Sequence, residues 1–172
     1  MKYTLTPFPG TSCAAVKSLQ VNAERPEPRL LRLTYTLNAD MAGLRIPAPA
    51  PGVPTLDLWK HTCFEMFYCL LGEDEYHEFN FAPSGAWDHY QFGDYRMRLP
   101  NAPKTKPVMR IAKQTADTLE MVVDVPLETR EPVDANLAAV IESTDGTLTY
   151  WALDHQDDEP NFHNQACFKA EL

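Results

Sequence analysis

The chain has 172 residues, of which 44% are hydrophobic and 23% are charged, so it is long and apolar enough to fold as a single domain spanning residues 1–172. Its 15 basic and 24 acidic residues give a formal net charge of −9, which argues against nucleic acid and anionic membrane surfaces as partners. No apolar run reaches the ~20 residues needed to span a bilayer, and the N-terminal residues lack the apolar segment of a signal peptide. We therefore expect a cytoplasmic protein.

Four cysteines stand at positions 13, 63, 69 and 167, and none forms a CxxC pair. Cys63 and Cys69 fall in one apolar run, where a strand would separate them by roughly 20 Å, beyond the reach of a disulfide. We expect four free thiols that pack as small apolar residues.

Alternating apolar and polar residues dominate the chain and predict strands rather than helices. The first such run covers residues 31–37. Proline-rich stretches at residues 24–28 and 47–54 are incompatible with a helix interior. Residues 61–71 and 76–81 are rich in aromatic side chains and are separated by a polar turn, so they predict a β-hairpin.

Further strands follow along the chain. Residues 87–97 predict one strand with a bend at Gly93-Asp94. Two more hairpins are predicted, one joining residues 108–114 to 119–125 and one joining 137–142 to 148–153, and a last strand covers 167–172. Asp145-Gly146, between the strands of the third hairpin, is a strong turn signal. About eight to ten short strands with polar turns predict an all-β protein, an antiparallel β-sandwich.

Residues of the first predicted hairpin alternate between two faces. If Phe64 and Phe79 pack against the core, the opposite face holds an imidazole, two carboxylates and an amide, namely His61, Glu65, Glu78 and Asn80. Aromatic side chains and a cation lie close to these in the sequence: Trp59, Trp87, Tyr90 and Arg96.

This mixture of side chains suits a saccharide. Sugar hydroxyls require paired donors and acceptors, and the apolar face of a pyranose packs on an aromatic ring. The alternative is an ordinary polar outer face of a sheet. Glu65 and Asn80 favour a binding site, because a polar group in such apolar surroundings needs a partner from the protein or from a ligand.

Three parts of the sequence resemble the DOMON-like ligand-binding domains: residues 58–67, residues 76–90 and the pair Tyr95-Arg96. The segments at 150–155 and 160–163 are similar to the end of the same domains. The resemblance is to the stand-alone bacterial group labelled MurB-like and, more distantly, to the family 9 carbohydrate-binding modules. It implies a jelly-roll β-sandwich that binds a small ligand.

The resemblance also implies roles for individual residues. The pattern of the sugar-binding modules would use Glu65, Glu78 or Asn80, and Arg96, together with a clamp of two tryptophans. In this sequence the clamp would pair Trp59 with Trp87 or Trp151.

Relatives within the resemblance bind haem or hold structural calcium. A haem site needs an axial Met–His pair, for which Met97 with His155 or His163 is available. The weak candidates for a metal site are His155, Asp157, Asp158 and His163. A solvated acidic turn is the alternative for these four residues, and we expect no cofactor.

The sequence thus predicts non-enzymatic binding of a small ligand, above all a saccharide or a sugar-containing metabolite. One alternative is a sugar-processing hydrolase in which Glu65 and Glu78, on paired strands, act at the spacing of a glycosidase pair. Common catalytic motifs such as GxSxG, the P-loop and HExxH are absent from the sequence. A second alternative is a haem-binding or protein-interaction module.

Overall fold

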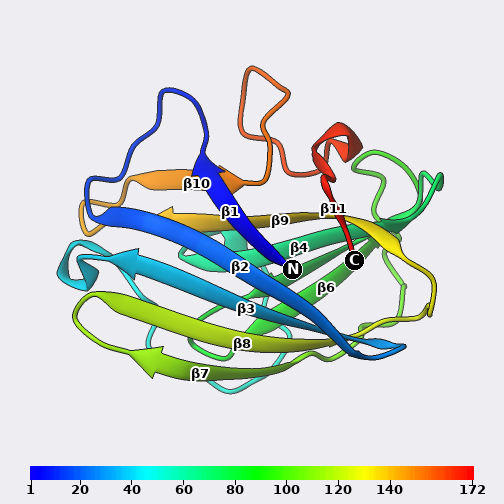
Figure 1. Ribbon diagram of the computed structural model, residues 1–172, viewed down its shortest axis with the longest axis horizontal. Coiled ribbons are helices and arrows are strands. Elements are labelled where there is room, and N and C mark those ends of the chain that lie inside the picture. Colours follow the sequence, from blue (N-terminus) through cyan, green and yellow to red (C-terminus); the bar gives the residue numbers. More distant parts are fainter.

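Eleven β-strands and three single-turn 3-10 helices make up the computed structural model, which describes residues 1–172 (Figure 1). The strands are β1 (Lys2–Pro7), β2 (Val16–Glu27), β3 (Leu30–Ala39), β4 (Cys63–Leu70), β5 (Tyr76–Phe81), β6 (Trp87–Phe92), β7 (Val108–Gln114), β8 (Thr118–Pro126), β9 (Val133–Glu142), β10 (Leu148–Ala152) and β11 (Ala170–Glu171). The helices are η1 (Met41–Gly43), η2 (Leu58–Lys60) and η3 (Gln165–Cys167). None of them is long and apolar enough to cross a membrane.

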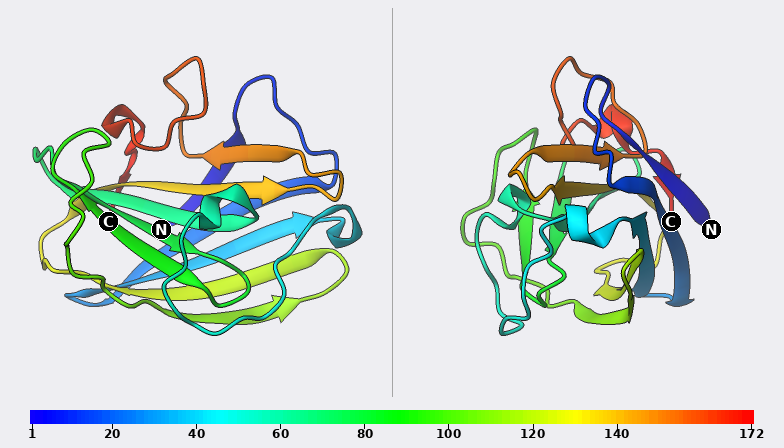
Figure 2. Two further views of the ribbon diagram at one scale, coloured as in Figure 1. Left: turned by 180° about the vertical axis from the view of Figure 1, so that it is seen from behind. Right: turned by 90° about the vertical axis from the view of Figure 1, so that its left-hand side faces the viewer.

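The strands form one curled sheet in the order β6-β5-β4-β9-β10-β1-β2-β3-β8-β7, with β11 attached to β9. Strand β1 joins two layers, because its first residues pair with β2 whereas Thr6 and Pro7 pair with β10. The layer β6-β5-β4-β9-β10 packs against the layer β1-β2-β3-β8-β7 (Figures 1 and 2). Every strand pairing is antiparallel, which confirms the predicted antiparallel β-sandwich.

A cluster of 29 buried residues fills the space between the two layers. Tyr35 of β3 stacks on Phe64 of β4 with ring centroids 4.8 Å apart, and its hydroxyl donates to the backbone carbonyl of Glu65 at 2.8 Å. Phe79 of β5 belongs to the same core, as the alternation along the first hairpin predicts. These contacts fix which face of β4 and β5 is turned away from the core.

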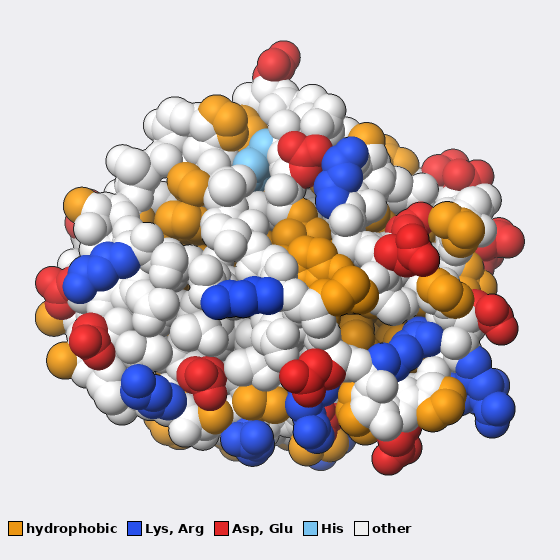
Figure 3. Space-filling model, viewed as in Figure 1, with side chains coloured by type: hydrophobic (Ala, Val, Ile, Leu, Met, Phe, Trp, Pro, Cys, Tyr) orange, Lys and Arg blue, Asp and Glu red, His pale blue; other side chains and the backbone are white.

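The outer face of the layer β1-β2-β3-β8-β7 is polar. Figure 3 shows acidic and basic side chains interspersed over it. Arg32 of β3 and Asp124 of β8 form an ion pair on it, with 2.7 Å between Nε and Oδ1. This face therefore has the composition of an ordinary solvated sheet surface.

Some elements differ from the sequence-based expectation. The structure adds β1 and β2, and β2 continues through Pro26, beyond Asn22, the last β2 residue that pairs with β1. Proline is tolerated there because it lies in the irregularity between Glu24 and Glu27, where the register of β2 with β3 shifts. The strand expected at 87–97 ends at Phe92, and the one expected at 167–172 is reduced to Ala170–Glu171. The third hairpin turn has Gly146 at a φ of 89°, and all four cysteines are free and buried, as predicted.

Candidate functional site

A cavity of about 390 Å³ opens on the outer face of the layer β6-β5-β4-β9-β10. Glu65 and Phe67 of β4 contribute to its wall, whereas Phe64 and Met66, which alternate with them, point into the core between the layers. The thirteen lining residues are Trp59, Glu65, Phe67, Glu78, Tyr90, Phe92, Arg96, Arg98, Val140, Tyr150, Pro160, Phe162 and His163. We call this cavity the outer-face pocket.

Two buried carboxyl groups lie in the outer-face pocket. Glu65 is opposite Asn80 in the β4–β5 register and Phe67 is opposite Glu78, so Glu65 and Glu78 are diagonal neighbours on one face. Glu65 is only 2% exposed and Glu78 only 5%. Glu78 Oε1 accepts a hydrogen bond from Asn80 Nδ2 at 2.6 Å, whereas Glu65 Oε1 has no hydrogen-bond partner.

Burial sets the ionisation of these two carboxyl groups. It raises the pKa of Glu65 well above its usual value, and the charge of Glu78 raises it further. Burial also raises the pKa of Glu78 to about 7, although the hydrogen bond from Asn80 and the charge of Arg96 act in the opposite direction. Burial therefore favours the neutral carboxylic acid form of Glu65, which can both donate and accept a hydrogen bond.

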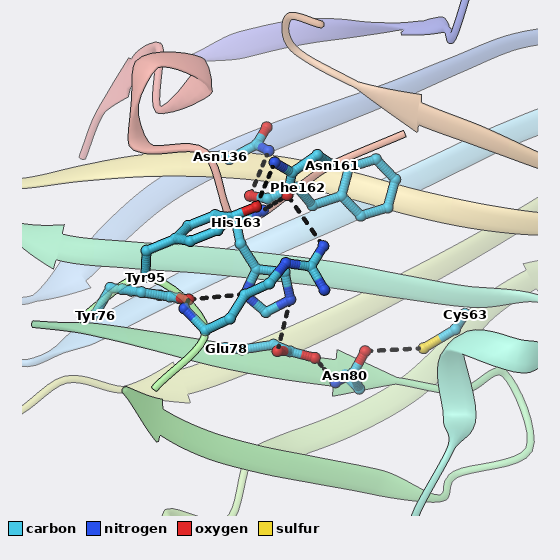
Figure 4. A network of polar contacts seen from close by, with 10 residues as sticks. Cys63, Tyr76, Glu78, Asn80, Tyr95, Asn136, Asn161, Phe162 and His163 are labelled. Carbon is cyan, nitrogen blue, oxygen red and sulfur yellow. Dashed lines mark hydrogen bonds and ion pairs between the residues drawn. The ribbon is translucent and has the colours of Figure 1, made fainter. Parts of the chain in front are cut away.

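A chain of polar contacts reaches Glu78 from the other side (Figure 4). The Arg96 backbone N–H donates to the Tyr76 hydroxyl at 3.0 Å, and that hydroxyl lies 2.8 Å from His163 Nδ1. The tyrosine proton is then free to be donated to Nδ1, which leaves the imidazole proton on Nε2, 3.7 Å from Glu78 Oε2. Burial lowers the pKa of His163 to about 4, so the ring is neutral at pH 7.

Two loops that carry pocket residues hold non-glycine residues in the left-handed backbone region. Arg96 has a φ of 55°, and Asp57, just before η2 and Trp59, has a φ of 62°. Such conformations are costly for residues with a Cβ atom and gather at binding sites. The Arg96 side chain is oriented further by its Nη2, which donates to Asn161 Oδ1 at 3.1 Å.

Aromatic rings form part of the pocket wall. Trp59 meets Tyr90 edge to face, with 6.0 Å between ring centroids, and remains 37% exposed. The guanidinium of Arg98 lies 4.0 Å from the centre of the Tyr90 ring. A ligand entering the outer-face pocket would therefore meet an accessible indole and a ring already covered by a cation.

The pocket brings together five residues that the sequence analysis selected: Trp59, Glu65, Glu78, Tyr90 and Arg96. Asn80 lies next to it, where its side-chain amide holds Glu78. It is fully buried, and it also accepts a weak contact from the Cys63 thiol at 3.7 Å (Figure 4).

Three selected residues lie elsewhere. His61 precedes β4, and its Nδ1 is 2.8 Å from Glu142 Oε2, in a different surface hollow. Trp87 is paired with Phe81 and donates its indole N–H to the carbonyl of Gly52. Trp151 belongs to the core between the layers.

The expected tryptophan clamp is therefore not assembled, because alternation along the strands turns Trp87 and Trp151 away from the outer-face pocket. On β10 the neighbouring residue Tyr150 faces the pocket in place of Trp151. On β6 it is Tyr90 that faces the pocket, together with Trp59 from η2.

Sequence reasoning did not select four prominent lining residues as ligand contacts: Arg98, Tyr150, Phe162 and His163. Arg98 follows a turn in which Arg96 has a φ of 55°, so strand periodicity could not have placed its side chain in the pocket. Phe162 and His163 come from the far C-terminal segment, and only the tertiary fold shows that this segment closes the pocket.

The candidates for a metal site do not converge. They are His155, Asp157, Asp158 and His163. His155 Nε2 contacts the carbonyl of Thr6 at 3.0 Å, whereas His163 faces Glu78 in the outer-face pocket. No group of three or more His, Cys, Asp or Glu side chains is arranged to hold a metal ion. Met97, considered as a haem ligand, is 65% exposed on the loop after β6.

Comparisons with known proteins bear on the fold. No family model matches the chain, and no curated protein matches it. Among solved structures it is similar to a proposed carbohydrate-binding protein from Bacteroides uniformis, with a TM-score of 0.60 and 15% sequence identity over 97% of this chain and 83% of that one. At this identity the likeness establishes the fold, a β-sandwich shared with that protein, and the narrower DOMON-like assignment stays a prediction.

Proposed function

We propose that this protein binds a saccharide or a sugar-containing metabolite in the outer-face pocket and does not transform it. The observation that carries the proposal is the Glu65 side chain, which is 2% exposed and leaves Oε1 without a hydrogen-bond partner. A buried polar atom without a partner costs about 1–3 kcal/mol, a cost that a bound ligand hydroxyl offsets.

The rest of the pocket matches the same ligand class. Its volume of about 390 Å³ is in the range of small-molecule sites, and it combines aromatic rings with a few polar groups. The protonated carboxyl group of Glu65 can donate and accept hydrogen bonds, and the guanidinium of Arg96 adds further hydrogen-bond donors. The similar Bacteroides uniformis protein, itself a proposed carbohydrate-binding protein, supports the same class of ligand.

A sugar hydrolase is the second candidate, because Glu65 and Glu78 are diagonal neighbours in one pocket. A glycosidase pair needs one protonated carboxyl and one that is ionised at the working pH. Burial raises the pKa of both carboxyl groups here, and that of Glu78 to about 7, so Glu78 is partly ionised at pH 7 and the pair is compatible with this chemistry.

The proposal is tested by titrating the protein with a panel of free mono- and disaccharides while recording tryptophan fluorescence and, separately, binding heat. We expect at least one sugar to bind with a defined stoichiometry and without product formation. Glu65→Met, which keeps the side-chain size but removes both oxygens, should weaken binding at least tenfold, or by ~1.4 kcal/mol.

The matched control is Glu120→Met on β8 in the opposite layer, which should bind like the wild type. Saturable binding that is equally strong in both variants would place the ligand outside the outer-face pocket. Release of a hydrolysed product would instead establish the second candidate.

A further inference from the structure

Two arginines at the outer-face pocket have no acidic partner. Arg96 donates to the neutral amide oxygen of Asn161, and Arg98 lies over the ring of Tyr90. Neither guanidinium forms a salt bridge with an acidic side chain. Both side chains are exposed, so their charges are open to a ligand that reaches the pocket.

Of the eight arginines of the chain, only Arg32 and Arg45 form ion pairs, and Arg96 and Arg98 are the two that line the outer-face pocket. The protein carries a net charge of −9, so acidic partners are plentiful. Arg32 is paired with Asp124 at 2.7 Å and Arg45 with Glu142 at 3.0 Å. The outer-face pocket thus holds unpaired positive charge in a protein whose surface is acidic overall.

The acidic groups of the pocket do not cancel that charge. Burial and the charge of Glu78 raise the pKa of Glu65 well above its usual value, and the pKa of Glu78 is raised to about 7. His163 is neutral, because burial lowers its pKa to about 4. Asp88, at the neighbouring register position of β6, is already paired with Lys104. Burial therefore disfavours negative charge on the two carboxyl groups that share the pocket with the guanidiniums.

The geometry of the loop after β6 holds both guanidiniums in place. The backbones of Phe92 and Arg98 form an isolated antiparallel β-bridge, and Gly93 donates its N–H to the carbonyl of Met97 at 3.0 Å. The segment after β6 therefore folds back on the end of β6. Arg96 and Arg98 are two residues apart on this segment. A guanidinium presents planar, paired donors that fit a carboxylate or a phosphate group, and stacking on an aromatic ring fixes its plane.

We propose that the ligand of the outer-face pocket is an anionic saccharide, whose carboxylate or phosphate group binds Arg96 and Arg98 while its hydroxyls bind Glu65. This inference rests on the proposed saccharide binding and narrows it to one chemical class. The aromatic and carboxylic part of the pocket recognises the sugar ring, and the arginines at its mouth recognise the acidic substituent.

The experiment compares matched pairs of sugars by calorimetry. Glucuronic acid is compared with glucose, galacturonic acid with galactose, and glucose 6-phosphate with glucose, and inorganic phosphate is titrated alone. We expect the acidic member of at least one pair to bind tenfold or more tightly than its neutral partner, and added salt to weaken only the acidic member. The carboxylate and phosphate arms identify which acidic group is preferred.

Arg98→Gln tests the assignment to the pocket. It should weaken binding of the acidic sugar at least tenfold more than binding of its neutral partner, whereas Arg110→Gln on β7 should change neither affinity. Melting curves of both variants should match that of the wild type, since the Arg98 side chain is exposed.

The other outcomes separate the two proposals. Equal affinity for the acidic and neutral members of every pair would overturn the anionic class and leave saccharide binding intact. Inorganic phosphate binding as tightly as glucose 6-phosphate would overturn it as well, because the ring would then contribute nothing. Absence of binding to every sugar, acidic and neutral, would refute saccharide binding itself.

Discussion

The two faces of the layer β6-β5-β4-β9-β10 are both buried, yet they are chemically different. The inner face is largely apolar, and the Tyr35 hydroxyl that approaches it is bonded to a backbone carbonyl. The outer face has only a small apolar cluster and buries Glu65, Glu78 and Asn80 beside it. The inner face therefore supplies stability, whereas the outer face gives up some stability for polar groups that a ligand can use.

The largest change in stability is expected for a substitution on the inner face. Phe64→Ala should lower the free energy of unfolding by about 3–5 kcal/mol, because it leaves a cavity beneath the stacked ring of Tyr35. Urea denaturation measures the change. A loss below about 1 kcal/mol would mean that the core closes over the gap and that the two faces do not differ in this way.

The next effect concerns the pH dependence that Glu78 imposes on stability. Its pKa is raised from an ordinary 4.5 to about 7 in the folded protein. The folded state therefore keeps a proton that the unfolded chain releases, and stability falls as the pH rises across this window.

Glu78→Gln removes this titration and keeps an acceptor for Asn80. The free energy of unfolding of the variant, relative to that of the wild type, should rise by on the order of 2–3 kcal/mol from about pH 5 to about pH 8. Urea denaturation at both pH values measures this change. The difference should stop growing above the folded-state pKa. A gain that is the same at both pH values would show that the outer face does not hold a protonated Glu78.

A smaller effect, on sugar affinity, is expected for a substitution in the aromatic wall of the outer-face pocket. Trp59→Ala should weaken sugar binding about tenfold, or ~1.4 kcal/mol, if the indole packs on the sugar ring. It should change the melting temperature little, because Trp59 is 37% exposed. Calorimetry and a melting curve on the same variant sharpen the contrast, since Trp151→Ala in the core should do the reverse.

The smallest effect is expected for His61→Ala. The side chain lies outside the outer-face pocket, and its partner Glu142 keeps an ion pair with Arg45 at 3.0 Å. Sugar affinity should be unchanged, and stability should fall by no more than about 1 kcal/mol, as for other exposed ion pairs. A tenfold loss of affinity would extend the binding site beyond the outer-face pocket.

Local periodicity made much of this arrangement predictable. Alternation along the first hairpin was enough to place Glu65, Glu78 and Asn80 on one face and Phe64 and Phe79 on the other, because strand geometry turns each residue opposite to its neighbours. The turn at Asp145-Gly146 was equally visible, since its glycine adopts a left-handed conformation that glycine readily accepts.

Long-range closure of the pocket was not predictable in the same way. Arg96 meets Asn161 across 65 positions of sequence, and His163 reaches Tyr76 across 87. The choice between Trp151 and Tyr150 depends on the phase of β10 against its neighbours, which the short run 148–153 does not fix. Strand β2 was not predicted, because the irregularity between Glu24 and Glu27 that accommodates Pro26 depends on pairing with β3, which the local sequence does not show.

The most direct test of the central contrast is the free energy of unfolding of Glu65→Met, measured with and without the best saccharide of the panel. Because Glu65 Oε1 has no partner in the protein, we predict that the variant is as stable as the wild type or more stable without sugar, and that sugar no longer stabilises it. A large loss of stability without sugar, together with undiminished stabilisation by sugar, would contradict this prediction and make Glu65 part of the structural core.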